Sequence, residues 1–225
     1  MKIYPKETKI YFINLPEHKE REINFRQRML EHGFDENMLE RIEGIRIEGI
    51  PQDDVYIGCF HSQLKTLKKA ASSGEFPFMI LEDDAEINYI PDSIEVPQNS
   101  DVVYVGISSW GFSPSPDGNL AEFNRIITDR VSSDVVKIFN MLSSHAILYT
   151  NKDYVDSLIE DLQNNLNGNQ QRSSSSDVPL KYYGGNLLPC DIIMANKQYH
   201  NNAYALRNPI FYQGDKHQYC TLIKI

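Results

Sequence analysis

Blocks of apolar residues alternate with longer, mostly polar stretches, and this pattern predicts an ordered series of strands and helices. Short runs rich in aromatic and β-branched residues predict strands at 9–15, 76–81, 101–107 and 144–150. Stretches in which apolar residues recur every three or four positions predict amphipathic helices within 17–31, 57–71 and 151–162, and another after 191. A strand followed at once by a helix is the first unit of an α/β domain.

Residues at the borders of these blocks are suited to ending or starting helices. Gly33 is a C-terminal stop for the first helix, because glycine readily adopts the left-handed conformation needed there. Asp53 or Asp54 is expected to cap the second helix, Asn151 the third and Asp191 the fourth. The pattern does not decide between strand and helix at 131–142, and the polar stretch at 164–177 predicts a loop.

The strand at 76–81 runs directly into three acids, Glu82, Asp83 and Asp84. Adjacent carboxylates repel one another unless a cation holds them, and hard oxygen ligands suit Mg²⁺ or Mn²⁺. If the strand continued, Glu82 and Asp84 would share one face and Asp83 would point to the other. Ligands of open α/β sheets gather at the C-terminal edge of the strands, which favours a metal site. A solvated acidic turn explains the same residues, and both interpretations stay open.

Composition limits the classes of partner. With 225 residues, 41% of them hydrophobic, the chain is long enough for a single large domain with a substantial core. The net charge of −9 argues against nucleic acid or an anionic membrane as the main partner. No apolar run approaches the roughly 20 residues of a membrane span, and the N-terminus lacks a signal-peptide core. Three cysteines without metal-site spacing suggest a reducing compartment, so the expected location is the cytoplasm.

Several other residues have both a functional and a structural interpretation. Arg21 suits a phosphate group or a pyrimidine ring, although arginines of this kind are more often solvated on the surface. Ser62 lies near a predicted helix start, where backbone N–H groups favour anions. Trp110 suits stacking on a sugar ring or filling the core. Asp191 suits either the helix cap already described or acceptance of a proton from a substrate hydroxyl.

Six segments, in order, resemble glycosyltransferase family 25. The strand and helix at 9–30 resemble the family's opening, in which an Ile-Asn-Leu strand precedes an arginine-containing helix. The other five are Tyr56 to Leu64 (YIGCFHSQL), Ile80 to Ala85 (ILEDDA), Ser144 to Tyr149 (SHAILY), Pro189-Cys190-Asp191 and Pro209 to Gln213. The second segment departs from the family pattern, because Gln63 stands where the family usually has His.

This resemblance implies an A-type glycosyltransferase fold, a Rossmann-like α/β/α sandwich with a mixed central sheet that binds a nucleotide sugar. It implies one domain over 1–225, with a nucleotide-binding half at about 1–107 and an acceptor-binding half at about 108–225. Relatives include lipooligosaccharide and collagen galactosyltransferases, and small domains of large algal viruses are similar. The implied reaction moves a hexose from a UDP-sugar to a hydroxyl of a glycan or glycoprotein acceptor with Mn²⁺ or Mg²⁺.

The resemblance also assigns roles to particular residues. Glu82 and Asp84 would hold the metal ion, with His217 as a third ligand by analogy with other A-type enzymes. Asp83 would contact the ribose or the donor sugar, and Asp191 would act as the base if the reaction inverts the anomeric centre. The uridine and phosphate side would be lined by Ile13, Asn14, Leu15, Arg21 and Ser62.

Two other classes of function fit the same acids. A metal-dependent nucleotidyltransferase or phosphohydrolase would use the same carboxylates, although the chain has no Gly-x-x-x-x-Gly-Lys phosphate loop. A non-catalytic sugar-binding module would keep the fold alone, and the retention of all three acids argues against it.

Overall fold

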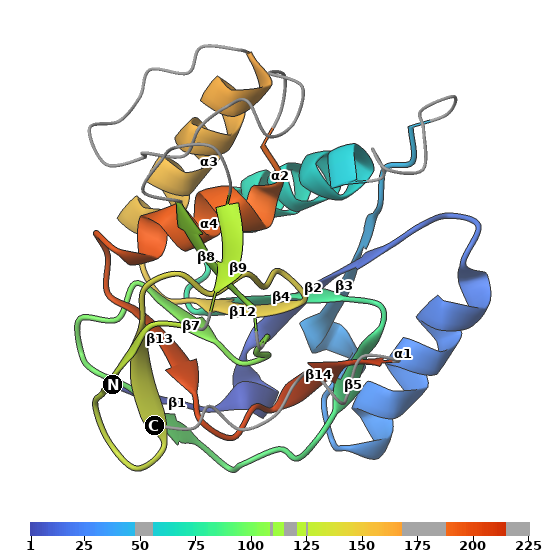
Figure 1. The fold of residues 1–225 in the computed structure, drawn as a ribbon. Helices are drawn as coiled ribbons and strands as arrows, with labels where there is room; N and C mark the ends of the chain where they lie inside the picture. The colour runs from blue at the N-terminus through green and yellow to red at the C-terminus, as the bar shows by residue number, and fades with distance from the viewer. Residues whose placement is uncertain (48–55, 109, 115–120, 125, 168–187, 215–225) are drawn as a thin grey trace.

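An eight-stranded mixed sheet forms the centre of the molecule (Figure 1). The computed structural model describes residues 1–47, 56–108, 110–114, 121–124, 126–167 and 188–214. The order across the sheet is β10-β11-β13-β7-β12-β4-β2-β3. These strands are β2 (Lys9–Asn14), β3 (Leu39–Glu43), β4 (Phe78–Glu82), β7 (Val102–Tyr104), β10 (Thr128–Arg130), β11 (Val135–Ile138), β12 (Ala146–Tyr149) and β13 (Ala203–Leu206).

Smaller pairs of strands and two short 3-10 helices complete the β-structure. The pairs are β1 (Lys2–Ile3) with β6 (Ile94–Glu95), β5 (Ala85–Ile87) with β14 (Phe211–Gln213), and β8 (Gly111–Pro114) with β9 (Ala121–Asn124). The 3-10 helices span Pro5–Glu7 and Glu36–Met38. The β5–β14 pair lies next to the three acids, because β5 begins at Ala85, directly after Asp84.

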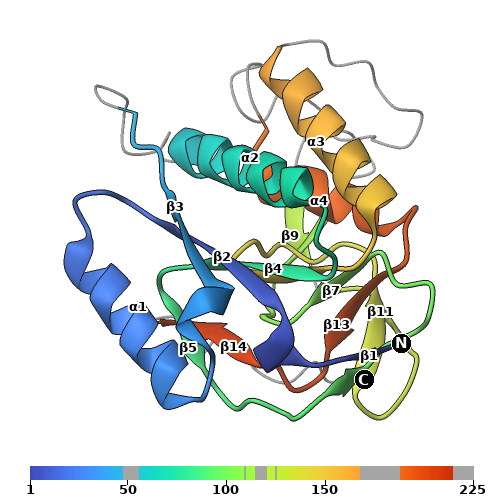
Figure 2. The ribbon, with the colours of Figure 1, turned by 180° about the vertical axis from the view of Figure 1, so that it is seen from behind.

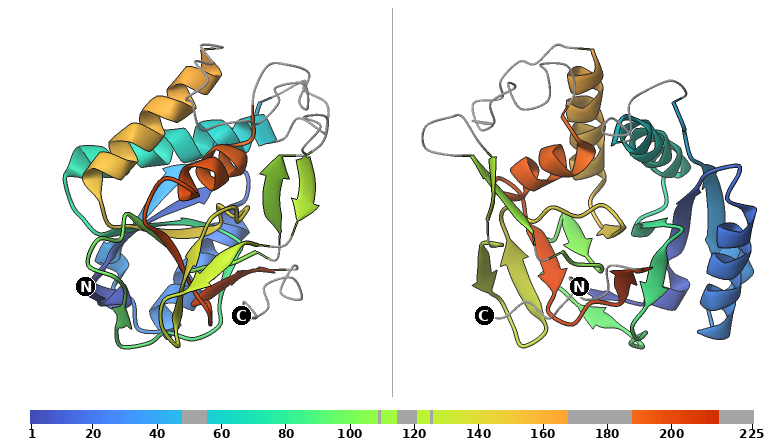
Figure 3. Two further views of the ribbon diagram at one scale, coloured as in Figure 1. Left: turned by 60° about the vertical axis from the view of Figure 1, so that its left-hand side comes forward. Right: turned by 45° about the vertical axis from the view of Figure 1, so that its right-hand side comes forward.

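Helices cover both faces of the sheet, and each face carries its own hydrophobic core (Figures 2 and 3). Helices α2 (Tyr56–Ser73), α3 (Lys152–Leu166) and α4 (Cys190–Gln198) lie on one face, and α1 (Lys19–Glu31) lies on the other. Successive side chains of a strand point to opposite faces, so β4 sends Phe78 and Ile80 into the first core and Met79 and Leu81 into the second. The continuous apolar run of β4 is the consequence of burial on both sides.

The helix signals in the sequence are confirmed at two positions. Asn151 caps α3, because its side chain accepts a hydrogen bond from the Asp153 N–H. Gly33 follows α1 with a φ of 83°, the left-handed conformation that favours glycine. Asp53 and Asp54 lie outside the described residues. No helix in the described part of the chain is long and apolar enough to cross a membrane.

Two expectations about local structure need correction. Asp191 is not the N-cap of α4: the cap position is Pro189, and Asp191 is the second residue of the helix, where its carboxylate accepts from the Ile192 N–H at 3.0 Å. The nearly all-apolar run at 101–107 is typical of a buried parallel strand, but β7 is parallel to β13 and antiparallel to β12. The stretch at 131–142, undecided from its pattern, contains β11.

One edge of the sheet collects the ends of several segments. Strands β2, β3 and β4 are parallel, so Asn14, Glu43 and Glu82 all reach this edge. Strand β12 is antiparallel to β4 and pairs Ala146 with Leu81, which brings Ser144, just before β12, to the same edge. The acids therefore lie where four neighbouring strands begin or end.

Candidate active site

The backbone of the acidic segment is fixed by three other parts of the chain. Strand β4 ends at Glu82, whose N–H donates to the carbonyl of His145 at 2.9 Å. The Asp83 N–H donates to the carbonyl of Ile13 at 3.1 Å, and the Asp84 carbonyl accepts from the Gly214 N–H at 2.9 Å. Asp83 and Asp84 form a turn, so the strand alternation that would separate their side chains does not extend to them.

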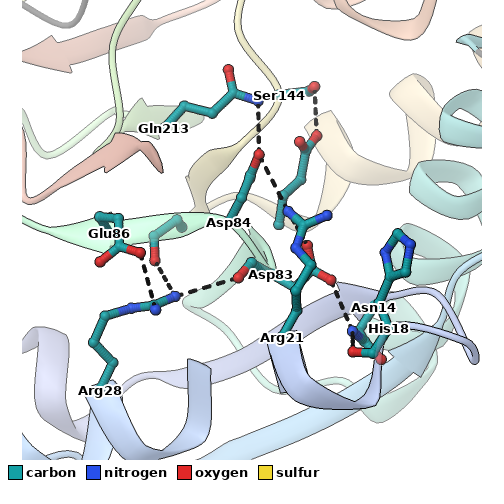
Figure 4. A network of polar contacts seen from close by, with 11 residues as sticks. Asn14, His18, Arg21, Arg28, Asp83, Asp84, Glu86, Ser144 and Gln213 are labelled. Carbon is teal, nitrogen blue, oxygen red and sulfur yellow. Dashed lines mark hydrogen bonds and ion pairs between the residues drawn. The ribbon is translucent and has the colours of Figure 1, made fainter. Parts of the chain in front are cut away.

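Asp83 is a buried carboxylate with a partner for each oxygen. Its Oδ2 accepts from Asn14 Nδ2 at 2.8 Å, and its Oδ1 lies 2.8 Å from Arg21 Nη2 (Figure 4). Burial raises the pKa of Asp83, while the Asn14 hydrogen bond and the Arg21 charge act in the opposite direction. Asn14 is itself fixed, because its Oδ1 accepts from Arg41 Nε at 2.9 Å. Asp83 is therefore held in one orientation by groups from β2 and α1.

Asp84 is less completely paired. Its Oδ2 lies 3.5 Å from Arg21 Nη2 and accepts from Gln213 Nε2 at 3.3 Å (Figure 4). Its Oδ1 is buried and has no hydrogen-bond partner in the structure. A buried carboxylate oxygen without a partner is costly, and such atoms deserve a functional explanation.

Glu82 points to a different set of partners. Its Oε1 accepts from Ser144 Oγ at 3.0 Å and from Gln63 Nε2 at 3.4 Å. Burial and the nearby Asp84 charge raise the pKa of Glu82 to about 7, and the bonds from Ser144 and Gln63 oppose that rise. Asp83 contributes less than Asp84, so Glu82 and Asp84 are the more strongly interacting pair of acids.

The three acids form part of the wall of a cavity of about 560 Å³, a size typical of small-molecule sites. Apolar side chains, cationic or imidazole side chains, and the start of α2 make up the rest. The full lining is Ile13, Leu15, His18, Arg21, Ile45, Arg46, Ile47, Gly58, Cys59, Ser62, Glu82, Asp83 and Asp84. The apolar part suits a planar ring, and the cationic part suits an anion.

Gly58 allows α2 to lie close to the segment that follows β3. A Cβ at this position would lie 2.5 Å from the backbone carbonyl oxygen of Ile45, so any larger residue would push the two walls apart. The Ser62 hydroxyl joins the same two walls: it donates to the Gly58 carbonyl at 2.7 Å and accepts from the Ile45 N–H at 2.8 Å. Ser62 therefore shapes the cavity by holding its walls together.

Most of the residues expected from the sequence line this one cavity, and among the described ones Asn14 and Asp191 do not. Asn14 supports the site through Asp83. Asp191 does not line the cavity, although Cys190, the residue before it, lies against Cys59 of the cavity wall. His217 lies outside the described residues. The expected residues that do line it are Ile13, Leu15, Arg21, Ser62, Glu82, Asp83 and Asp84.

Sequence reasoning did not predict several residues of the site. Ser144 and Gln213 reach the acids only through the antiparallel pairings of β12 and β14, which no local pattern encodes. Gln63 carried a signal, as a departure from the family pattern, but nothing indicated that it bonds Glu82. No pattern in the sequence distinguishes His18 and Arg46, which line the cavity, from the other charged residues near them.

The three acids meet the needs of a divalent metal only together with other ligands. Among the described residues, no group of three or more His, Cys, Asp or Glu side chains is arranged to hold an ion. Mg²⁺ is, however, commonly held by one or two carboxylates together with water and substrate phosphates. Glu82 and the unpartnered Oδ1 of Asp84 supply that smaller set of hard oxygen donors. The residues present therefore fit an ion that is held jointly by protein and substrate.

We expect Glu82 to reduce stability at neutral pH. Below pH 4.5 its carboxyl is protonated in both the folded and unfolded chain, so it has no effect there. As the pH rises from 4.5 to about 7, the unfolded chain loses this proton first, and the folded state is progressively disfavoured. Glu82→Gln should therefore raise the free energy of unfolding by about 2 kcal/mol at pH 8 and hardly at all at pH 4.

Urea unfolding in EDTA at the two pH values measures this difference. Glu95→Gln is the matched control, because it removes the same charge from an exposed position on β6. Equal effects of Glu82→Gln at pH 4 and pH 8 would show that Glu82 titrates like a surface carboxylate.

No family model matches the chain, and no curated protein matches it. Among solved structures, the chain is similar to a glycosyltransferase involved in the glycosylation of the major capsid of PBCV-1, with 12% identity and a TM-score of 0.38. That alignment covers 88% of this chain and 92% of the other. A similarity this low does not assign a function.

Proposed function

We propose that this protein is a metal-dependent glycosyltransferase that moves a hexose from a UDP-sugar to a hydroxyl of a glycan or glycoprotein acceptor. The observation that supports the proposal is the composition of the 560 Å³ cavity: three acids at the sheet edge share it with Arg21, His18 and an apolar wall. These environments match the parts of a bound UDP-sugar. The acids suit the metal ion on the diphosphate, the cationic side chains suit the phosphate charge, and the apolar wall suits the base. The resemblance of the sequence segments to family 25 points to the same chemistry.

Each part of the cavity has a role in this proposal. Ile13 and Leu15 offer an apolar surface to the base, and Arg21 offers charge-assisted hydrogen bonds to phosphate oxygens. Glu82 and Asp84 would hold a Mn²⁺ or Mg²⁺ ion. When bound, such an ion supplies electrostatic stabilisation of the charge that develops on a departing diphosphate, worth several kcal/mol. Asp83, fixed by Asn14 and Arg21, would orient the ribose or the donor sugar.

The transfer breaks the bond between the anomeric carbon and the β-phosphate oxygen and forms a bond from that carbon to the acceptor oxygen. In an inverting reaction a base must take the acceptor hydroxyl's proton. Asp191 suits that role, because burial raises its pKa and its carboxylate accepts hydrogen bonds from backbone N–H groups of its own helix turn. A hydrogen bond with Cys59, burial and nearby charges raise the pKa of the neighbouring residue, Cys190. Because Cys59 lines the cavity, this contact joins the start of α4 to the cavity wall.

Calorimetric titration with UDP tests the proposal. We expect binding in Mn²⁺ to weaken at least about tenfold in EDTA, because the diphosphate would then face the acids directly. UDP binding that is equal in EDTA, or absent in both conditions, would contradict the proposal. Turnover of a nucleoside triphosphate without sugar transfer would instead favour a nucleotidyltransferase or phosphohydrolase. A panel of UDP-sugars in Mn²⁺, scored by thermal stabilisation, identifies the donor.

A further inference from the structure

Arg21 already acts as a cation for two of the three acids. Its Nη2 lies 2.8 Å from Asp83 Oδ1 and 3.5 Å from Asp84 Oδ2 (Figure 4). Its side chain lines the cavity and is 43% exposed. Without a positive charge between them, these adjacent carboxylates would repel each other. Toward Asp84, Arg21 therefore supplies the positive charge that the proposed function gives to a divalent ion held by Glu82 and Asp84.

The two contacts of Arg21 are not equivalent. Asp83 has a strong second partner in Asn14, so it stays oriented whatever Arg21 does. The contact with Asp84 is the longer one, at 3.5 Å, and Asp84 shares the same oxygen with Gln213 at 3.3 Å. Its other oxygen is buried without a partner. Asp84 is thus the acid that has most to gain from a different cation.

The guanidinium itself is free to serve another anion. It sits at the first turn of α1, lines the cavity, and is exposed over nearly half of its side chain. Arginine presents a planar fork of donors that matches phosphate oxygens, and it stays charged at any relevant pH. Arg21 can therefore exchange one contact with a carboxylate for contacts with a diphosphate without losing its charge.

We infer that Arg21 is a built-in substitute for the divalent ion: it holds Asp84 while the site is empty, releases it when the ion binds, and then pairs with the donor diphosphate. This inference rests on the proposed function and adds an order to binding at the same site. Because the metal and Arg21 compete for Asp84, the protein alone holds the ion weakly. Because the released guanidinium attracts the diphosphate, ion and nucleotide strengthen each other's binding, and linkage makes that effect reciprocal.

Arg21→Gln should change two affinities in opposite directions. Without nucleotide, Mn²⁺ should bind about three- to tenfold more tightly, because its competitor is gone. In saturating Mn²⁺, UDP should bind about tenfold more weakly, because the diphosphate has lost a cationic partner. Electron paramagnetic resonance of free Mn²⁺ measures the first affinity and calorimetry the second. A residue with a merely structural role would weaken both.

Arg46→Gln is the matched control. Arg46 lines the same cavity and carries the same charge, but it pairs with Glu17 at 3.0 Å instead of with the acids. It should leave the Mn²⁺ affinity within about twofold of the wild type. Arg21→Lys keeps the charge without the fork and should bind Mn²⁺ nearly as weakly as the wild type.

The outcomes separate this inference from the proposed function. One outcome is that wild-type protein binds UDP in a Mn²⁺-dependent manner while Arg21→Gln binds Mn²⁺ as tightly as the wild type or more weakly. In that case the inference about Arg21 is wrong and the proposed function stands. If neither protein binds Mn²⁺, even with UDP, both ideas fail. Should Arg21→Gln unfold, the Arg21 Nε–H signal in nuclear magnetic resonance of the wild type decides: it must shift on Mg²⁺ addition, and an unchanged signal overturns the inference.

Discussion

Asp84→Asn is expected to lower sugar transfer by at least about 100-fold while the fold is preserved. The substitution removes the negative charge that would hold the divalent ion, and such an ion contributes several kcal/mol, at roughly 1.4 kcal/mol for each factor of ten in rate. The amide keeps nearly the same shape, and its oxygen can still accept from Gln213. Transfer from the best UDP-sugar, measured across a range of Mn²⁺ concentrations, tests the prediction.

The control for Asp84→Asn is Asp92→Asn, which removes one negative charge from an exposed residue outside the cavity. It should leave the rate within about twofold of the wild type. A rate for Asp84→Asn that matches this control would remove Asp84 from the proposed metal site. Partial recovery of Asp84→Asn at high Mn²⁺ would be consistent with weaker ion binding.

Asp191→Asn should lower kcat by about 10²- to 10⁴-fold, the usual contribution of a general base, and leave UDP affinity unchanged. This substitution distinguishes catalysis from structure, because asparagine also accepts backbone hydrogen bonds at the start of a helix. The amide oxygen can keep the contact with the Ile192 N–H but cannot take a proton from the acceptor. Steady-state kinetics with saturating donor give kcat, and thermal denaturation reports on the fold.

Asp153→Asn provides the comparison for Asp191→Asn, because Asp153 occupies the first turn of α3 just as Asp191 occupies that of α4. Asp153→Asn should reduce stability slightly, by roughly 0.3–1 kcal/mol, through the helix dipole, whereas at Asp191 the burial of the charge opposes that loss. A kcat for Asp191→Asn within about threefold of the Asp153→Asn value would assign Asp191 a structural role. It would also favour a mechanism without a base on the protein at that position.

The local elements could be predicted from the sequence because their signals are local. The acid-ended strand, observed as β4 (Phe78–Glu82), is marked by an apolar run that stops at charged residues. Helix α3 (Lys152–Leu166) is marked by its cap and its apolar periodicity. The α/β class with a mixed sheet follows from the structure, whereas the finer A-type assignment stays a prediction.

The pairing of distant segments could not be predicted in the same way. Strand β12 has the apolar character that either direction of pairing would require, so its antiparallel position beside β4 had no sequence signal. The contact of Gln213 with Asp84 depends on the β5–β14 pair, which joins residues more than 120 positions apart. Likewise, Arg21 was expected at phosphate, and its contacts with Asp83 and Asp84 emerged only when α1 was placed. The metal ligands and the base stay predictions.

The position of β12 has a consequence for folding during synthesis and for attempts to exchange parts of the chain. It comes from the later part of the chain, yet it lies between β4 and β7, both of which come from the earlier part. Strands that sandwich a later strand cannot finish their hydrogen bonding until that strand has been synthesised. The sheet edge that carries the acids therefore cannot assemble until the residues near 150 have been synthesised. Exchange of the segment that contains β12 for that of another protein would disturb its pairing with both β4 and β7.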